Sequence, residues 1–334
     1  MKLYMDNGYI NARETLESPY TFIFGVGARG IGKTYNYLDA LVKSKKKFIL
    51  LRLKQDEADL ISSEVANPFK PIKGLEITAK KINKYIGGYY QKDELVGVCM
   101  SLNCFASCRG MDFSDFDYIF LDEFIPEKHI KRIPALGEAL KNCYETVNRN
   151  RELMGLPPVK LIAMANSLNM NNDILISFGL IDVIHKMQKT GEEVYYDKSR
   201  SLMMIYPRSS PISDAKAQTA LYKLEGAYAD MALKNEFREF FEGNIKPQNL
   251  KGYRPYCIYD NLCIYRSTQA QRRYYVTETR RGDFSGKEYT NTDFERVSFM
   301  RKYINLFDDY FSGKIIFEKA ELELIFCNLF KIMK

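Results

Sequence analysis

Unbroken apolar runs alternate with helical segments along the first 205 residues of the chain. Runs without polar alternation are typical of parallel strands that are covered on both faces. The predicted strands lie at residues 20–24, 48–53, 117–123 and 161–165. A helix is predicted at residues 35–45, and a second helix carries Leu136, Leu140, Tyr144 and Val147 on one face. This order predicts an α/β fold whose open sheet has a parallel core.

Other segments have weaker patterns. Residues 76–100 are predicted to form short hairpin strands, with Gly87-Gly88 as a break between them. Pro207 and Pro211 mark a second break, and a mixed, helical segment follows. The remaining predicted elements are strands at 256–259, 262–265 and 273–277, with a turn at Asp260-Asn261, and helices at about 294–311 and 318–333.

The basic residues are concentrated in one stretch of the chain. The 334 residues are 46% hydrophobic and 27% charged, which is typical of a globular protein, and the formal net charge is +7. Residues 246–302 hold 12 Lys or Arg and 6 Asp or Glu, whereas the first 245 residues hold 33 and 31. The excess in one stretch predicts a polyanionic partner there.

The cysteine count and the lack of long apolar runs indicate the cellular compartment in which the protein works. Seven cysteines are an odd number in a long chain, which favours reduced thiols over a disulfide framework. Cys99, Cys104 and Cys108 cluster without a CxxC pair, so we expect core-filling thiols rather than a zinc site. No apolar run approaches the roughly 20 residues that span a membrane, and residues 1–11 lack the apolar core of a signal peptide. We expect an intracellular protein that does not enter a membrane.

A glycine-rich loop follows the first predicted strand. Its residues, Gly27-Ala28-Arg29-Gly30-Ile31-Gly32-Lys33-Thr34, match G-x-x-x-x-G-K-[ST] in full and lead into a helix. Glycines let backbone N–H groups converge on phosphate oxygens. Lys33 is then expected to meet the β- and γ-phosphates, and Thr34 to bind Mg²⁺. An ordinary strand-to-helix turn is the alternative, but the flanking elements favour a nucleotide site.

An acidic pair, Asp122 and Glu123, ends the third predicted strand. An Asp at this place can hold the water shell of Mg²⁺, and the adjacent Glu can polarise a water for attack on the γ-phosphate. Two solvated residues at a strand end are the alternative. A nucleotide switch needs no such Glu, so the pair predicts ATP hydrolysis with ATP and Mg²⁺ as ligands.

Five other polar residues are weaker candidates. Asn166 follows the fourth strand, where it either senses the γ-phosphate or forms a turn. Arg149 and Arg151 end a helix, and they either reach a neighbouring subunit's nucleotide or stabilise the helix C-terminus. Arg52 and Lys54, after the second strand, are either solvated or contribute to a nucleotide or subunit interface.

The chain resembles the DNA-packaging ATPases of phi29-like tailed phages, which are P-loop motors of the additional-strand, catalytic-glutamate (ASCE) class. The matching stretches are G-A-R-G-I-G-K-T at 27–34, F-L-D-E-F-I at 120–125, T-V-N-R-N-R-E at 146–152 and A-N-S at 165–167. The resemblance implies a P-loop ATPase domain at 1–205, a lid or linker at 206–248, and a smaller α+β, RNase H-like domain at 249–334 that lacks the nuclease's metal-binding acids.

The resemblance also implies a function. The chain would be an ATP-driven double-stranded DNA translocase that packages a viral genome into a preformed capsid. Its partners would be double-stranded DNA, copies of itself in a homopentameric ring and the portal of the procapsid, with a structural packaging RNA as a further possible partner. It would act in the host cytoplasm at the portal vertex and be absent from the mature virion. Arg149 is implied as the finger acting in trans, with Arg151 as the alternative, and Lys54 as the basic residue after the second strand.

The C-terminal basic residues are interleaved with Tyr256, Tyr265, Tyr274 and Tyr275, and this pattern predicts a surface for a DNA backbone. The set is Arg254, Arg266, Arg272, Arg273, Arg280, Arg281 and Lys287. A solvated basic face is the alternative. The carboxylates of this region are scattered and match no two-metal nuclease pattern, so we expect DNA binding without cutting.

Three other functions stay open on the sequence alone. Strand separation without capsid dependence would favour a replication or repair helicase. Metal-dependent DNA cleavage would favour a nuclease-competent terminase large subunit. Unimpaired function of Glu123→Gln, with ATP binding retained, would favour a nucleotide-gated scaffold or RNA-binding adaptor.

Overall fold

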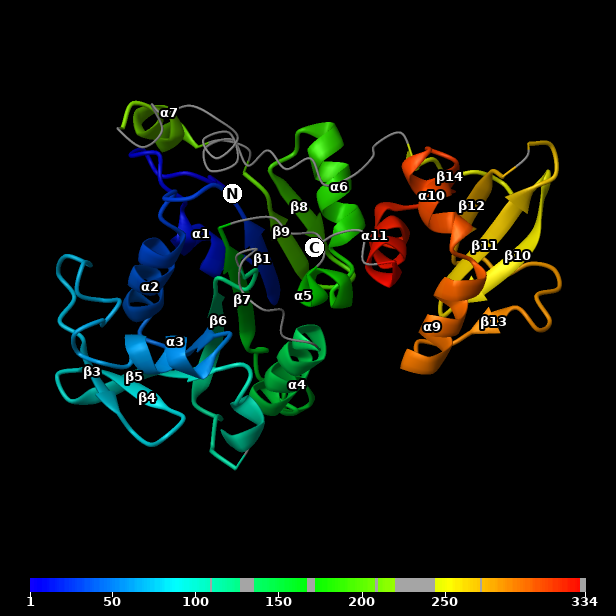
Figure 1. The fold of residues 1–334 in the computed structure, drawn as a ribbon. Coiled ribbons are helices and arrows are strands. Elements are labelled where there is room, and N and C mark those ends of the chain that lie inside the picture. The colour runs from blue at the N-terminus through cyan, green and yellow to red at the C-terminus, as the bar shows by residue number, and fades with distance from the viewer. Residues whose placement is uncertain are drawn as a thin grey trace. The chain divides into compact units, whose positions relative to one another are not determined.

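The computed structural model describes residues 1–108, 110–126, 135–166, 172–207, 210–219, 244–270 and 272–330. The chain divides into two compact units, Met1–Phe237 (unit 1) and Arg238–Lys334 (unit 2), both drawn in Figure 1. Each unit has its own sheet and its own apolar core. Within the described ranges, no helix combines the length and apolar character needed to cross a membrane.

A nine-stranded sheet forms the centre of unit 1, in the order β3-β4-β5-β2-β6-β7-β1-β9-β8. The strands from β5 to β9 in this order are parallel, whereas β3, β4 and β8 run antiparallel to their neighbours. The bounds are β1 (Phe22–Val26), β2 (Lys47–Arg52), β3 (Thr78–Lys81), β4 (Gly87–Gln91), β5 (Glu94–Ser101), β6 (Phe116–Asp122), β7 (Lys160–Ala165), β8 (Val194–Asp197) and β9 (Leu202–Ile205). The predicted mixed α/β sheet with a parallel core is therefore present.

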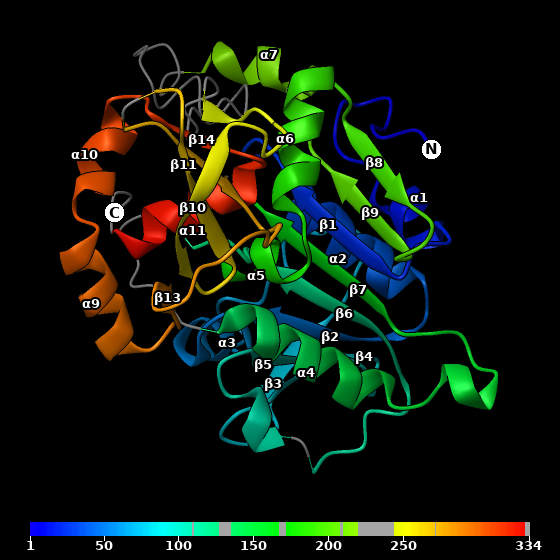
Figure 2. The same cartoon turned by 90° about the vertical axis from the view of Figure 1, so that its right-hand side faces the viewer.

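Helices cover both faces of this sheet. In Figures 1 and 2, α1, α2 and α3 lie on one face and α4, α5 and α6 on the other. In this strand order, the connection from β1 to β2 runs towards β3, whereas the connection from β6 to β7 runs towards β8. Because both crossovers are right-handed, their helices, α2 and α4, lie on opposite faces of the sheet. The bounds are α1 (Ala12–Glu17), α2 (Lys33–Lys43), α3 (Gln55–Ile61), α4 (Leu136–Asn148), α5 (Asp173–Ser177), α6 (Ile181–Thr190) and α7 (Pro211–Ala217), with short 3₁₀ turns at Phe105–Cys108 and Glu152–Met154.

The predicted core strands and the first helix lie within two residues of their observed positions. β1 continues past the predicted end at Phe24, because Gly25 has no side chain and a Cβ there would collide with the sulfur of Met164 on β7. α2 starts at Lys33, two residues early, because Gly32 takes a left-handed φ of 84° and turns the chain directly into the helix.

The break predicted at Gly87-Gly88 is wrong, since both glycines lie inside β4. The β4–β5 hairpin turns instead at Lys92 and Asp93, whose φ angles are 48° and 65°. A Cβ on Gly87 would collide with the side chain of Ser62, which follows α3. The glycine therefore serves a close approach between backbone segments rather than a turn.

Unit 2 contains a five-stranded sheet in the order β13-β10-β11-β12-β14. β10, β11 and β12 form an antiparallel meander, and Asp260, with φ of 52°, turns the first hairpin as predicted. β13 and β14 pair in parallel with β10 and β12. The bounds are β10 (Tyr253–Tyr259), β11 (Leu262–Ser267), β12 (Tyr274–Thr277), β13 (Glu288–Tyr289) and β14 (Ile315–Phe317).

Three helices pack on one face of this second sheet (Figure 1): α9 (Asp293–Lys302), α10 (Asn305–Phe311) and α11 (Ala320–Leu329). The single helix predicted at 294–311 is two helices. The chain turns at Tyr303, whose buried ring packs against Tyr256 and Phe299 at centroid distances of 5.2 and 4.9 Å. Of the predicted lid or linker at 206–248, residues 208, 209 and 220–243 lie outside the described residues.

Candidate functional site

The carboxyl ends of four neighbouring parallel strands bring polar residues together at one edge of the unit 1 sheet. β1 leads into the Gly27–Thr34 loop, β2 ends at Arg52, β6 ends at Asp122, and Asn166 follows β7. These strands are adjacent in the order β2-β6-β7-β1, so their ends meet. The carboxyl edge of an open α/β sheet is the usual place for a ligand.

The Gly27–Thr34 loop has the backbone of an anion cradle. Gly30 and Gly32 have φ angles of 72° and 84°, and a Cβ on Gly27 would lie 2.7 Å from the side chain of Pro207. Lys33 is buried, and its Nζ donates to the carbonyl oxygens of Gly27 at 2.9 Å and Ala28 at 2.7 Å. An ammonium group thus lies inside the loop at the N-terminus of α2, an arrangement that suits a phosphate.

Thr34 and Asp122 place a hydroxyl and a carboxylate side by side at the end of the loop. The Oγ1 of Thr34 lies 3.0 Å from each carboxylate oxygen of Asp122. Hydroxyl and carboxylate oxygens are the ligand types that Mg²⁺ takes, either directly or through its bound waters. Burial raises the pKa of Asp122 to about 6, against the opposing effect of Arg52, so the carboxylate is still charged at neutral pH. A hydroxyl and a charged carboxylate therefore fit Mg²⁺.

Glu123 lies directly after β6, with a left-handed φ of 56° that departs from the strand conformation. Its carboxylate is about half exposed and has two partners. Oε1 accepts a hydrogen bond from Nδ2 of Asn166 at 3.0 Å, and Oε2 pairs with Nη2 of Arg52 at 2.7 Å. A solvent-accessible carboxylate beside the Thr34–Asp122 pair is placed to accept a proton from water.

Arg52 supplies the positive charge that pairs with the acidic side chains of this site. Its Nη1 lies 2.9 Å from Asp122 and its Nη2 2.7 Å from Glu123, while Nε lies 3.8 Å from Glu57. Burial lowers the pKa of Arg52, but the carboxylates of Asp122 and Glu123 outweigh that effect and raise it overall. Sequence reasoning missed this contact, because it depends on β2 lying beside β6. A basic residue at the end of an apolar strand is the only local signal.

Lys54 does not join the site. It precedes α3 as the N-cap residue, and its side chain makes no hydrogen bond or ion pair with any residue that the structure describes. Arg52, the last residue of β2, is the basic residue that contacts the carboxylates.

Arg149 and Arg151 lie at the opposite edge of the sheet. Arg151 donates to the carbonyl oxygen of Phe116 and pairs with Asp117, both at 2.9 Å, so it is held at the start of β6. Arg149 caps α4, is exposed, and donates to the carbonyl oxygen of Met111 at 3.2 Å. The strand from Asp117 to Asp122 spans about 16 Å, so both arginines are far from the Gly27–Thr34 loop of their own chain.

The predicted DNA-contacting residues fall into two groups. Arg272 pairs with the buried Asp309 at 3.0 Å and Arg280 pairs with Glu288 at 2.6 Å, so these two charges are neutralised within unit 2. The other five have no ion-pair partner in the part of the chain that the structure describes: Arg254, Arg266, Arg273, Arg281 and Lys287. Arg254 and Arg266 are directly opposite each other on β10 and β11.

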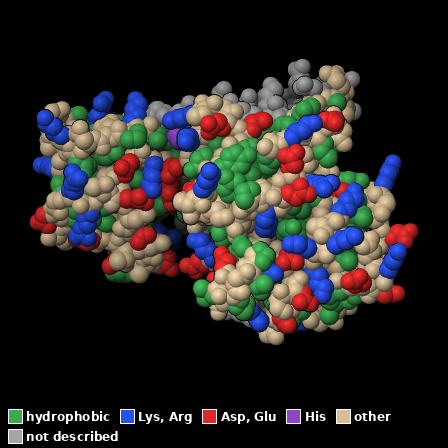
Figure 3. Space-filling model, turned by 180° about the vertical axis from the view of Figure 1, so that it is seen from behind, with side chains coloured by type: hydrophobic (Ala, Val, Ile, Leu, Met, Phe, Trp, Pro, Cys, Tyr) green, Lys and Arg blue, Asp and Glu red, His purple; other side chains and the backbone are tan. Residues whose placement is uncertain are grey.

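The tyrosines predicted to share that surface belong to the core, so that part of the prediction is wrong. Tyr265, Tyr274 and Tyr275 are each 1% exposed, and Tyr256 is partly buried. Their large rings supply buried apolar area, and the hydroxyl of Tyr275 accepts an internal hydrogen bond from the backbone of Gln248. On the face drawn in Figure 3, basic and acidic side chains are interspersed.

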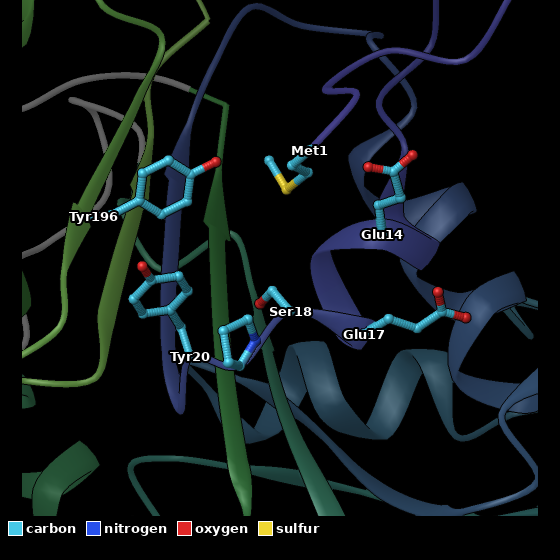
Figure 4. A pocket seen from close by; sticks show the side chains of 7 residues that line it. Met1, Glu14, Glu17, Ser18, Tyr20 and Tyr196 are labelled. Atoms are coloured by element: carbon cyan, nitrogen blue, oxygen red, sulfur yellow. The ribbon is translucent and has the colours of Figure 1, made fainter.

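A pocket of about 340 Å³ lies away from this site. Figure 4 shows Tyr20 and Tyr196 on one side of it and Glu14 and Glu17 on the other. Tyr20 precedes β1, so the pocket lies at the amino edge of the sheet, opposite the Gly27–Thr34 loop. Its residues are not among those predicted from the sequence to bind a nucleotide.

Comparisons with known proteins bear on the family and the fold of this chain. The family model for the podovirus DNA encapsidation protein (Gp16) matches residues 5–246. The DNA packaging proteins of Bacillus phages PZA and phi29 are each 27% identical to this chain over 236 residues, which are 69% of this chain and 66% of theirs. The match thus spans just under two thirds of the length of these relatives. A chain of the bacteriophage Phi-29 viral genome packaging motor assembly shares the fold, with a TM-score of 0.66 at 19% identity over 98% of this chain and 99% of that chain.

Proposed function

This chain belongs to the podovirus DNA encapsidation protein (Gp16) family, and we propose that it is the ATP-hydrolysing motor that drives double-stranded DNA through the portal into a preformed capsid. The contact between Thr34 and Asp122 carries the proposal, since it joins the glycine-rich loop to the acidic end of β6. Unit 1 would then hold a P-loop ATPase domain of the ASCE class. Unit 2 would hold an RNase H-like domain that binds DNA without cutting it, and residues 206–248 would form the lid or linker.

The site residues have separate roles in this proposal. Lys33 binds the β- and γ-phosphates within the loop. Thr34 and Asp122 would hold Mg²⁺, Asp122 through bound water, and the ion would supply positive charge for the phosphate oxygens. Glu123 accepts the proton of the attacking water. Asn166, through its 3.0 Å hydrogen bond to Glu123, links the γ-phosphate position to the end of β7.

The proposed partners are supported by the family membership and by the position of Arg149 in unit 1. Arg149 is exposed at the edge away from its own Gly27–Thr34 loop, which supports a role on a neighbouring subunit's nucleotide rather than on its own. We infer a homopentameric ring at the portal vertex of the procapsid, in the host cytoplasm during assembly, with a structural packaging RNA as a further partner. Basic residues of unit 2 that lack acidic partners would bind the DNA backbone.

The test is ATP hydrolysis by the purified full chain, with and without double-stranded DNA. We expect a DNA-stimulated rate that falls by about 10²–10⁴-fold in Glu123→Gln while ATP binding is retained. Glu94→Gln, an exposed carboxylate on β5, is the matched control and should behave as wild type. An unchanged rate in Glu123→Gln would contradict the assigned base. A rate that DNA does not alter even with procapsids present would contradict the translocase.

A further inference from the structure

The hairpin of β3 and β4 concentrates positive charge that the average over unit 1 hides. The first 245 residues hold nearly equal numbers of basic and acidic residues, yet residues 77–92 hold four lysines and no acidic residue. Lys80 lies near the end of β3, and Lys84 lies in the loop 82–86 that follows. Both are exposed, and neither makes an ion pair with any residue that the structure describes. We call these two lysines and the loop the basic hairpin end.

Tyrosine rings and a side-chain hydrogen bond order the basic hairpin end. The Nζ of Lys80 lies 5.6 Å from the ring centroid of Tyr90, and that of Lys84 lies 5.3 Å from the ring centroid of Tyr85. Within the loop, Oδ1 of Asn83 accepts a hydrogen bond from the backbone N–H of Tyr85 at 2.8 Å. A tyrosine ring attracts a cation but carries no charge of its own, so both ammonium groups keep their full charge for an anion.

The basic hairpin end lies at the same edge of the sheet as the candidate nucleotide site. β3 runs in the same direction as β5 and β2, so its last residue and the loop after it lie at the carboxyl edge. α3 contacts both places. The side chain of Gln55 donates to the carbonyl oxygen of Tyr85 at 3.4 Å, and Glu57 lies 3.8 Å from Nε of Arg52. Because Arg52 pairs with the two carboxylates of the nucleotide site, one short helix joins that site to the hairpin.

Protection of a sheet edge is the ordinary reason for lysines in such a place. β3 is the last strand at one side of the unit 1 sheet (Figure 1), and lysines on edge strands hinder pairing with a strand of another molecule. This reason applies to Lys80 and to Lys81, which also pairs with Asp59 of α3 at 2.9 Å. It does not apply to Lys84, which lies in the loop beyond the strand. Edge protection therefore explains only part of the charge.

We propose that the basic hairpin end binds the phosphate backbone of double-stranded DNA. Exposed ammonium groups without acidic partners suit a phosphate backbone, and such contacts carry no base sequence information. A translocase must hold and release its DNA as the nucleotide changes, so a contact joined through α3 to the nucleotide site suits the moving DNA better than a static RNA. This inference rests on the proposed function, to which it adds a DNA-binding site in unit 1 beside that of unit 2.

Fluorescence anisotropy of a labelled DNA duplex, titrated with the full chain between 50 and 200 mM salt, tests this site. The hairpin variant, Lys80→Gln/Lys84→Gln, should reduce the slope of log affinity against log salt concentration by about two, one for each lost phosphate contact. Lys73→Gln/Lys92→Gln is the matched control, because it removes two exposed lysines that precede β3 and follow β4. Its slope should equal that of wild type.

Two further measurements identify what the lysines do. An RNA duplex of the same sequence is the second probe, and a loss of slope confined to RNA would overturn DNA as the ligand. Sedimentation of the hairpin variant tests edge protection, since aggregation with a wild-type slope in the soluble fraction would assign the lysines to that role alone. Should the double variant misfold by circular dichroism, Lys84→Gln, in the loop, replaces it and should reduce the slope by about one.

This site and the proposed function can fail separately, because anisotropy needs no ATP hydrolysis. A wild-type slope in the hairpin variant, with DNA-stimulated hydrolysis intact, would overturn the site and leave the motor standing. A chain that binds DNA through the basic hairpin end but hydrolyses no ATP would contradict the proposed function and leave the site standing.

Discussion

The guanidinium of Arg52 lies 2.7 Å from the carboxylate of Glu123 and 2.9 Å from that of Asp122, so one cation balances two adjacent acids. Asp122 is buried, and burial raises its pKa to about 6, while Arg52 is the strongest of the groups that oppose this rise. A carboxyl group with that pKa is ionised at pH 7 by a margin of only about one unit. The charge available to Mg²⁺ on Asp122 therefore depends on Arg52.

We expect Arg52→Ala to raise the Mg²⁺ concentration needed for half-maximal nucleotide binding by about tenfold at pH 7. Without the guanidinium the pKa of Asp122 rises further, and a neutral carboxyl group is a poor Mg²⁺ ligand. Because the proton is lost again as pH rises above the raised pKa, the deficit should shrink at pH 8.5. The measurement is binding of a fluorescent ATP analogue against Mg²⁺ concentration at pH 6, 7 and 8.5.

Two further variants make this prediction specific. Arg52→Lys keeps one positive charge and should give an intermediate Mg²⁺ requirement. Lys47→Ala, at the other end of β2 in an exposed pair with Asp115, should leave the requirement unchanged. A shift in Arg52→Ala that is the same at every pH would show that Arg52 acts by some route other than the charge on Asp122.

The parts of the site that are contiguous in the chain could be predicted from the sequence, and those that depend on strand order could not. The loop Gly27–Thr34 is a local pattern between a strand and a helix, and Asp122 and Glu123 end an apolar run. Arg52 contacts both acids only because β2 lies beside β6 in the sheet, 70 residues away along the chain. Local hydrophobic periodicity contains no information about that neighbour.

Tertiary contacts likewise decided the elements that were predicted wrongly. Gly87 has the composition of a turn, but it lies in β4, where the absence of a Cβ leaves room for the side chain of Ser62. The helical pattern in the sequence continues past Tyr303. In the structure, the ring of Tyr303 is buried against Phe299 and α9 ends at this residue. Arg272 looks like a free surface cation in the sequence, but Asp309, 37 residues away, neutralises it. The apolar runs of the parallel core were predicted within two residues, because burial on both faces leaves a local pattern.

We expect Arg151→Ala to lower stability and Arg149→Ala to lower ATP hydrolysis. Arg151 is half-buried, pairs with Asp117 and donates to the backbone of Phe116, so its removal should lower the free energy of unfolding by about 1–3 kcal/mol. Arg149 is exposed, and its removal should change that free energy by no more than about 0.5 kcal/mol. Hydrolysis by the assembled Arg149→Ala chain should nevertheless fall by about 10³-fold or more.

Urea denaturation and steady-state ATP hydrolysis of the two arginine variants separate these effects. Lys141→Ala, at an exposed position on α4, is the control for a lost surface cation in the same helix. Full ATP hydrolysis by the assembled Arg149→Ala chain would show that Arg149 is not the arginine finger that acts on a neighbouring subunit's nucleotide. Equal destabilisation by both substitutions would mean that Arg149 is a structural residue.

Glu323 is expected to make the stability of unit 2 depend on pH. It is fully buried on α11, where the hydroxyl of Tyr310 donates to its Oε1 at 3.0 Å. Burial raises its pKa from 4.5 to about 7. The folded chain therefore holds a proton that the unfolded chain has already released between these values, so this stabilising contribution falls as pH rises towards 7.

Glu323→Gln should remove that dependence, because the amide oxygen can still accept from Tyr310 but does not titrate. Between pH 6 and pH 8 the wild-type free energy of unfolding should fall by about 1.4 kcal/mol more than that of the variant. Urea denaturation at the two pH values measures this difference. Parallel pH profiles for the two chains would place the titrating group elsewhere.

Arg254 and Arg266 face each other across β10 and β11, and neither has an ion-pair partner among the described residues. Like charges directly opposite on neighbouring strands cost stability, and a phosphate between them would offset that cost. We therefore expect Arg254→Gln/Arg266→Gln to fold at least as stably as wild type and to bind double-stranded DNA more weakly. Each lost phosphate contact should reduce the slope of log affinity against log salt concentration by about one.

Arg272→Gln is the matched control for this pair, since the charge of Arg272 is already neutralised by Asp309 at 3.0 Å. It should lower the stability of unit 2, because it leaves a buried carboxylate with fewer partners, and it should leave the salt slope unchanged. Fluorescence anisotropy of a labelled duplex between 50 and 200 mM salt covers the range in which phosphate contacts dominate. A wild-type slope in the double variant would place the DNA-binding surface on other residues. A reduced slope in Arg272→Gln would mean that its ion pair opens when DNA binds, so that paired as well as unpaired cations contact the backbone.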